Sequence, residues 1–216
     1  MIAGAALTLT ACDTGAGGPA ASTAASTSFT PTACGTYSGR GCAPASKRVD
    51  LAKPSFESPT EITNRFFPIS DLHSALLLGH VDDTPFRTET TLLPGTKTVT
   101  WDGKDIRVLV SQYIAYLDGR LAEAAIDRYA QADDGSVWYL GEDVFDYENG
   151  TVAATEGTWL AGKEGPAAMI MPADPKVGDV FRPENIPGVV FEEVSVKSVD
   201  EDAIAAHYGI ADTTVD

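Results

Sequence analysis

Four tight-turn dipeptides along the middle of the chain constrain its fold more than any other feature of the sequence. They are Asp102-Gly103, Asp118-Gly119, Asp134-Gly135 and Asn149-Gly150, and each favours a two-residue turn between antiparallel strands. The segments between them are rich in β-branched and aromatic residues. The sequence therefore predicts a mainly β fold, an antiparallel meander that forms a curled sheet or half-barrel with one or two short helices.

The predicted strands follow from these turns and from the alternation of apolar residues. Residues 104–117 carry apolar side chains on both faces, which is typical of a central strand covered on both sides. Pro94-Gly95 is predicted to be a turn. Short helices are predicted at residues 71–78 and 201–208, the second with Asp200 as its N-cap. Further strands are expected at 87–93, 96–101, 121–131, 137–141, 151–160, 167–171 and 189–196.

The first twelve residues predict where the protein is located. A short apolar stretch ends in Leu9-Thr10-Ala11-Cys12, which looks like a bacterial lipobox at the end of a signal peptide. In that motif the thiol of Cys12 accepts a diacylglyceryl group, and the cysteine becomes the mature N-terminus. We therefore expect a lipoprotein on the extracytoplasmic face of a bacterial membrane. The alternative is an ordinary cysteine in a leader. No Lys or Arg precedes the stretch, so we expect the true translation start to lie upstream.

A linker is expected between this anchor and the folded domain. Residues 13–52 consist mainly of Ala, Ser, Thr, Gly and Pro, which bury little apolar surface. They contain Cys34 and Cys42, which we expect to form a disulfide in an exported protein; two free thiols or a metal pair are the alternatives. The β-rich domain is expected over residues 53–216, and its first segment has four apolar anchors: Phe56, Ile62, Phe66 and Phe67.

The charge of the chain restricts its partners. The 216 residues carry a formal net charge of -16, and most of the acidic side chains follow residue 50. Such a chain repels phosphates, so we exclude nucleic acid as a partner. No apolar run reaches the roughly 18 residues of a membrane-spanning helix, so the expected contact with the membrane is the lipid on Cys12.

Acidic side chains near the Asp134-Gly135 turn form a candidate cation site. A two-residue loop there would place Asp127 directly opposite Glu142, and Asp143 follows at once. Opposed carboxylates repel, and a shared proton, a nearby arginine or a bound cation would relieve them. Ca²⁺ prefers such oxygen ligands. A Ca²⁺ site at Asp127, Glu142 and Asp143 is the functional hypothesis, and no other cofactor is expected. The alternative is a solvated acidic edge, since a one-residue shift of register would separate the pair.

Aromatic side chains in the predicted strands form a candidate ligand groove. On a curved sheet they could line a groove for an apolar or sugar ligand. The alternative is that they fill the hydrophobic core. The candidates are Trp101, Tyr113, Tyr129, Trp138 and Trp159.

Sequence motifs for catalysis are missing from the chain. It contains no G-x-S-x-G, S-x-x-K or P-loop motif, so no catalytic residue is assigned. His73, His80 and His207 are scattered, and we interpret them as surface or core residues. The favoured hypothesis is a binding domain for a small apolar ligand, a glycan or an envelope protein. A carboxylate- or metal-dependent hydrolase of envelope material and a structural spacer are the alternatives.

Four segments stand out as a set: ITNRFFP (62–68), EAAIDRYAQADDGSVWYLGE (123–142), GTW with two later glycines (157–165), and MPADP with Gly-Asp (171–179). Together they resemble a family of uncharacterised secreted bacterial proteins, many of them lipoproteins. The resemblance covers roughly residues 54–200, is most specific in its middle third, and implies an envelope location but no activity and no catalytic residue. Members of that family usually continue with further strands, so we expect a C-terminal truncation here.

Overall fold

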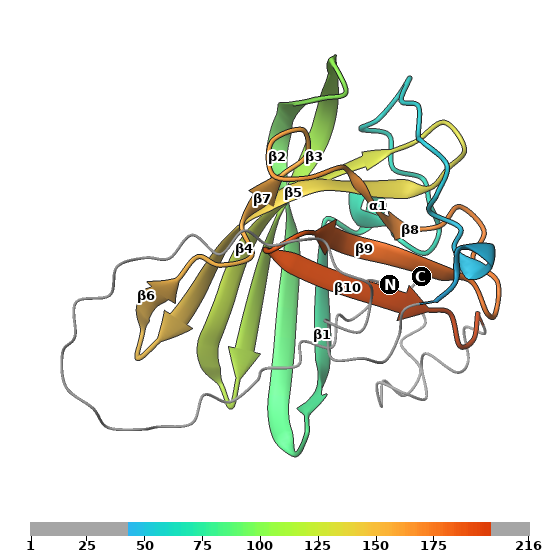
Figure 1. Ribbon diagram of the computed structural model, residues 1–216. Helices are drawn as coiled ribbons and strands as arrows, with labels where there is room; N and C mark the ends of the chain where they lie inside the picture. The colour runs from blue at the N-terminus through green and yellow to red at the C-terminus, as the bar shows by residue number, and fades with distance from the viewer. Residues whose placement is uncertain (1–42, 200–216) are drawn as a thin grey trace.

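The computed structural model describes residues 43–199, which form an antiparallel sheet and a smaller two-stranded one (Figure 1). The main sheet has the order β1-β2-β3-β4-β5-β6, with β7 and β8 also paired to β5. The second sheet is the β9–β10 hairpin. The mainly β, antiparallel fold predicted from the turn dipeptides is confirmed, and the main sheet is not closed. The elements are the 3-10 turn η2 (Ala45–Lys47), helix α1 (Ile69–Leu72), and strands β1 (Ser74–Val81), β2 (Thr84–Trp101), β3 (Lys104–Leu117), β4 (Arg120–Gln131), β5 (Val137–Glu148), β6 (Thr151–Ala154), β7 (Trp159–Leu160), β8 (Ala168–Met171), β9 (Val180–Ile186) and β10 (Val190–Ser195).

Three of the four predicted dipeptides form two-residue hairpin turns. At Asp102-Gly103, Asp118-Gly119 and Asn149-Gly150 both residues have positive φ, and the flanking residues pair directly. This is the type I′ geometry, whose twist matches that of the strands it joins. Asp134-Gly135 instead belongs to a longer connection between Gln131 and Val137.

Two local predictions are wrong. Residues 71–78 are not a helix, because α1 ends at Leu72, the next residue, His73, has a φ of 55°, and β1 begins at Ser74. Pro94-Gly95 is not a turn between strands. It lies inside β2, where the register with β3 shifts between Leu92 and Thr96 and the strand continues.

Two other segments differ from their predictions. Strand β9 was not predicted, and residues 151–160 form two short strands, β6 and β7, instead of one. The predicted helix at 201–208 lies outside the described residues.

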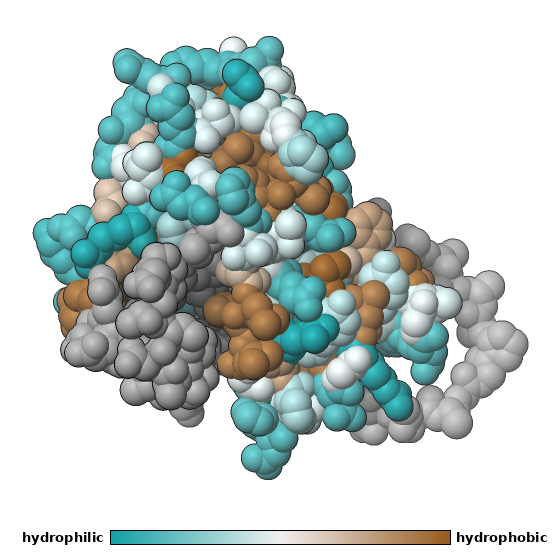
Figure 2. Space-filling model, turned by 180° about the vertical axis from the view of Figure 1, so that it is seen from behind, coloured by the Kyte–Doolittle hydropathy of each residue, from teal (hydrophilic) through white to brown (hydrophobic). Residues whose placement is uncertain are grey.

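The β9–β10 hairpin crosses one face of the main sheet (Figure 1). We call this the inner face and the opposite one the outer face. Leu76 and Leu78 of β1 lie on the outer face and are each 54% exposed, and Figure 2 shows apolar patches among hydrophilic residues on the back of the molecule. No helix in the described part of the chain is long and apolar enough to cross a membrane.

The hydrophobic core is formed by residues of the main sheet, the β9–β10 hairpin and the segment that precedes α1. Ile62 and Phe67 of that segment are almost fully buried, while Phe56 and Phe66 pack against the core from its edge, as expected for apolar anchors. The described structure also includes part of the segment expected to be linker. Within the expected linker, Arg48 forms a β-bridge with Val180 of β9.

Candidate functional site: an acid cluster on the inner face

The pairing of β4 with β5 brings two carboxylates together at the centre of the inner face. Tyr129 pairs with Tyr139, and Asp127 pairs with Glu142, as the sequence predicted for the second pair. From the first pair to the second, β4 advances by two residues but β5 by three. Strand β5 therefore contains one extra residue, a β-bulge, between Tyr139 and Glu142. The prediction of the acidic pair thus holds although the predicted two-residue loop does not, because the bulge compensates for the longer connection.

Gly141 makes this bulge possible. Its φ is +128°, a region that L side chains rarely adopt, and a Cβ on it would lie 2.4 Å from the backbone oxygen of Trp159. The extra residue in β5 turns Glu142 to the same face as Tyr139, although the two are three positions apart in the chain. A regular strand would have placed them on opposite faces.

Asp127 is the most enclosed member of the site. Its side chain is only 4% exposed and accepts hydrogen bonds from the hydroxyl groups of Tyr139 at 2.8 Å, Tyr129 at 3.0 Å and Ser111 at 3.3 Å. Burial raises the pKa of Asp127 to about 6, although these hydrogen bonds favour the charged form and lower it.

Glu142 and Glu184 form a second, coupled pair of carboxyl groups between the main sheet and the hairpin. Glu142 accepts a hydrogen bond from the Tyr139 hydroxyl at 3.0 Å, and Glu184 accepts one from the indole Nε1 of Trp159 at 2.8 Å. Burial, together with the charge of Glu184 and a hydrogen bond between the two side chains, raises the pKa of Glu142 far above its ordinary value. A proton on Glu142 relieves the repulsion between the two carboxyl groups.

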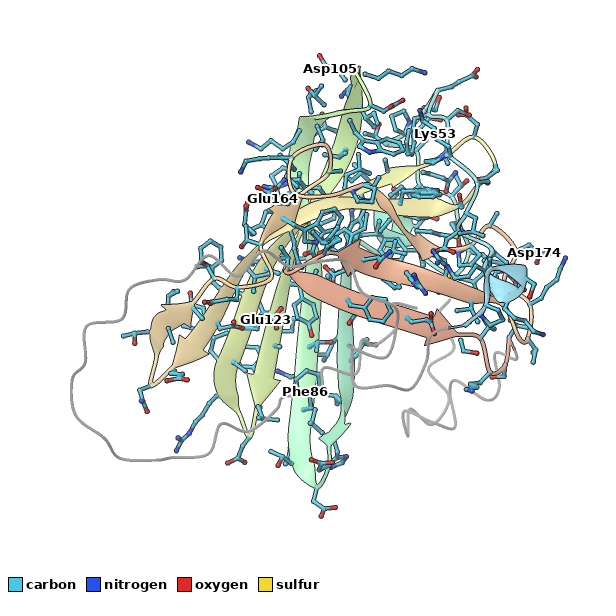
Figure 3. All side chains as sticks on the ribbon, in the orientation of Figure 1. Lys53, Phe86, Asp105, Glu123, Glu164 and Asp174 are labelled. Carbon is cyan, nitrogen blue, oxygen red and sulfur yellow. The ribbon has the colours of Figure 1, made fainter. Side chains whose placement is uncertain are left out.

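Glu123 and Glu192 lie at the partly exposed rim of the same face (Figure 3 labels Glu123). Burial raises the pKa of each to about 7. The charges of Asp146, Asp127 and Glu184 raise the pKa of Glu123 further, and those of Glu184 and Glu123 raise the pKa of Glu192. Tyr113 lies near both, and its pKa is raised by burial and by the charges of these carboxylates. We call Glu123, Asp127, Glu142, Glu184 and Glu192 the acid cluster.

The salt bridges described for residues 43–199 do not include a carboxylate of the acid cluster. The ion pairs of Lys and Arg in this part of the chain involve other carboxylates. The charges that raise the pKa values of the cluster belong to its own members and to neighbouring acids such as Asp146. The inner face therefore has a strongly negative potential that an added cation would relieve.

The third predicted calcium ligand, Asp143, is not part of this site. It follows Glu142 on the strand and therefore points to the outer face, where its carboxylate accepts a bond of 2.5 Å from Arg128. Within the described residues no group of three or more His, Cys, Asp or Glu side chains is placed to hold a metal ion. The predicted set of Asp127, Glu142 and Asp143 is thus corrected: the structure brings together only its first two members.

Most of the predicted groove aromatics lie in the hydrophobic core. Trp138, Tyr129 and Trp159 are buried, the tyrosine stacks on Tyr139, and Trp159 packs edge-on against the same ring. This is the core arrangement that we stated as the alternative to a groove. Trp101 is half-buried next to Phe56 and Lys53 at the upper end of the sheet, away from Tyr113 on the inner face. The five residues therefore do not form one groove.

The remaining predicted residues are placed as follows. His73 and His80 are exposed at the start and near the end of β1. Cys12, Cys34, Cys42 and His207 lie outside the described residues.

Sequence reasoning missed Glu184, Glu192 and Glu123. The two hairpin residues belong to β9 and β10, which are joined by a Pro187-Gly188 turn but show no clear alternation, and β9 contains Pro183. Only the tertiary position of the hairpin brings them over β4 and β5. Glu123 is in phase with Asp127 along β4, so period two alone would have placed both carboxylates on one face.

Comparisons with known proteins give no further assignment. No protein-family model matches the chain, and no match was found among curated proteins or solved structures.

Proposed function

We propose that this protein is a lipid-anchored extracytoplasmic domain that binds a cationic organic ligand on its inner face. The observation that carries the proposal is the acid cluster: five carboxylates gathered on one face without a cationic partner in residues 43–199. Burying carboxylates is costly unless protons or counter-charges compensate.

The rim of the cluster is the part that a ligand could reach. Glu123, Glu192 and Tyr113 are partly exposed, whereas Asp127 and Glu142 lie behind them. None of the hydrogen bonds within the described residues involves the hydroxyl of Tyr113, so this group remains available to a ligand. A phenol ring beside two carboxylates suits an ammonium group, which gains from ion pairing and from contact with the ring face.

An organic amine is favoured over a metal ion. The described side chains do not assemble three metal ligands, and the rim offers an aromatic ring, which a metal ion does not use. An apolar or sugar ligand has less support than the sequence suggested, because the aromatic residues that we expected to line its groove are mostly core residues.

Isothermal titration calorimetry with spermidine at constant ionic strength tests the proposal. We expect saturable binding that weakens at least about tenfold in the Glu123→Gln/Glu192→Gln variant, because each lost ion pair in a partly desolvated site contributes roughly 1 kcal/mol or more. Glu89→Gln/Glu148→Gln, which removes the same charge from a half-buried position of β2 and an exposed position of β5, both outside the acid cluster, is the matched control and should bind like the wild type.

Two results would contradict the binding proposal. One is the absence of saturable binding at millimolar spermidine. The other is an equal loss of affinity in both double variants, which would show that only the net charge of the chain attracts the amine.

The lipid anchor is tested separately. Cys12 lies outside the described residues, and the proposal rests on its lipobox-like sequence and the linker that follows it. The full-length protein expressed in a bacterial host should incorporate labelled palmitate, and Cys12→Ser should not. Label in the serine variant would contradict the anchor.

A carboxylate-dependent hydrolase is the second candidate. Its support is that Asp127 and Glu142, which are direct register partners, have pKa values that are raised to very different extents, the pattern of an acid and a base in one site. Release of reducing sugar from envelope polysaccharide by the wild type, but not by Asp127→Asn, would favour this candidate.

A further inference from the structure

We propose that the contact between β10 and the inner face is a pH-sensitive switch: β10 is held against the sheet while the acid cluster is protonated and detaches as the cluster becomes charged. This inference needs no ligand, although it concerns the same carboxylates as the proposed function. It is argued from the way the carboxylates oppose one another across strands.

Three pairs of carboxylates stand directly opposite each other in the β-ladders. On the sheet, Asp127 pairs with Glu142 and Glu123 pairs with Asp146. On the hairpin, Glu192 pairs with Glu184. Like charges in directly opposed positions destabilise a sheet, and here the hairpin pair also lies over the sheet pairs.

The side chains that shift the pKa values of these carboxylates are acidic or uncharged, and Arg182 of β9 forms its salt bridge with Glu193, which alternates with Glu192 along β10. Tyrosine, serine and tryptophan donate hydrogen bonds to the cluster but do not neutralise charge, and Glu156 adds a further negative charge next to Asp146. The groups that face this contact, strand by strand, are Ser111 and Tyr113 of β3, Glu123, Asp127 and Tyr129 of β4, Tyr139, Glu142 and Asp146 of β5, Trp159 of β7, Glu184 of β9 and Glu192 of β10.

The two strands of the hairpin are not equally anchored. Phe181 and Ile186 fix β9 in the core at 2% and 0% exposure, whereas all residues of β10 are half-buried or exposed. The β9–β10 ladder is also irregular between Glu192 and Val194. Strand β10 is therefore the part that can separate at low cost, and it carries Glu192.

The sign of the effect follows from the direction of the pKa shifts. Burial against the sheet raises the pKa of Glu123 and Glu192 to about 7, whereas a detached β10 would restore values near 4.5. The closed form therefore binds more protons, its advantage is complete below about pH 4.5, and that advantage is lost as the pH rises through about 7.

Hydrogen exchange of the β10 amides tests the switch, with the intrinsic pH dependence of exchange removed. In the wild type we expect the protection of residues 190–195 to fall at least about tenfold between pH 5.5 and 8, which corresponds to about one proton. Strand β4, whose amides exchange only when the whole sheet unfolds, should remain the more strongly protected strand at every pH. In Glu192→Gln, which cannot acquire the charge, the fall should be much smaller. Glu148→Gln, an exposed position at the end of β5, should behave like the wild type.

Three outcomes would overturn the proposal. Protection of β10 that does not change with pH shows that no switch exists. An undiminished fall in Glu192→Gln shows that this group is not the one that titrates. Equal protection of β4 and β10 at every pH shows that both strands exchange by unfolding of the whole sheet instead of a local opening.

Discussion

Gly141 shows how one residue determines which side chains face the candidate site. Its unusual φ and its closeness to the Trp159 backbone allow the β5 bulge, and the bulge turns Glu142 inward beside Tyr139. A substitution at this glycine therefore affects both the backbone and the acid cluster.

We expect Gly141→Ala to destabilise the protein by about 2–4 kcal/mol, because alanine is strained at this φ and its Cβ overlaps the Trp159 oxygen. Urea unfolding measures the change in free energy. Gly79→Ala is the control, because a Cβ there meets nothing within 4 Å; similar losses in the two variants would contradict the explanation.

Tyr139 is the residue that joins Asp127 to Glu142. Its hydroxyl lies within hydrogen-bonding distance of both carboxyl groups, at 2.8 Å and 3.0 Å. Tyr139→Phe should cost about 1–3 kcal/mol, because it leaves buried carboxyl oxygens without this donor. Tyr113→Phe removes a hydroxyl that makes no hydrogen bond within the described residues, so thermal unfolding should show a clearly smaller loss. An equal loss would mean that the network contributes nothing to stability.

Among the elements, the segment before α1 has a specific attachment that its sequence did not reveal. The buried side chain of Asn64 donates hydrogen bonds of 2.9 Å to the backbone oxygens of Gly135 and Pro172, and its backbone N–H donates to Gln131. One asparagine thus connects the β4–β5 turn to the segment after β8.

Asn64→Ala should destabilise the protein by about 2–3 kcal/mol, since two buried carbonyl groups lose their donor. Limited proteolysis should then cleave the segment around residues 55–66 faster than it does in the wild type. Asn185→Ala, which changes a half-buried asparagine of β9, is the comparison. Unchanged cleavage in Asn64→Ala would show that apolar burial of Ile62 and Phe67 alone holds the segment.

Turn chemistry explains which elements the sequence predicts well. Asp-Gly and Asn-Gly dipeptides adopt positive φ at low cost, so three hairpins and the central strands are evident from local residues alone. Pro94-Gly95 carries an equally strong turn signal, but tertiary pairing with β3 keeps both sides of it in one strand. Similarly, Asp127 and Glu142 were predictable as a pair, whereas Glu184 and Glu192 reach the site only through the path of a distant hairpin.

At the scale of the whole molecule, the acid cluster gives the protein an unusual dependence of stability on pH. Glu123, Asp127, Glu142 and Glu192 all have raised pKa values in the folded state. The unfolded chain releases their protons near pH 4–4.5, so the stability that they contribute is fully present below that pH. The contribution of Glu123, Asp127 and Glu192 is lost as the pH rises through about 6–7, whereas that of Glu142 persists to higher pH. Carboxylates with lowered pKa values would act in the opposite direction.

We therefore expect the free energy of unfolding to decrease by about 2 kcal/mol between pH 5 and pH 8 at constant ionic strength, after allowance for the partial exposure of the rim. Urea unfolding across this range measures it. Glu123→Gln/Glu192→Gln should flatten the curve, whereas Glu89→Gln/Glu148→Gln should not. Stability that rises with pH would contradict the assigned protonation states.

The additional residue in β5 also makes this strand unusually sensitive to its length. Removing one residue at 140–141 would exchange the orientations of all side chains that follow, up to the Asn149-Gly150 turn. Phe145 would then turn toward the interior, and so would Asp143, the partner of Arg128. Glu142 would face solvent. A deletion in this short stretch is therefore expected to be far more harmful than a substitution at most of the positions around it.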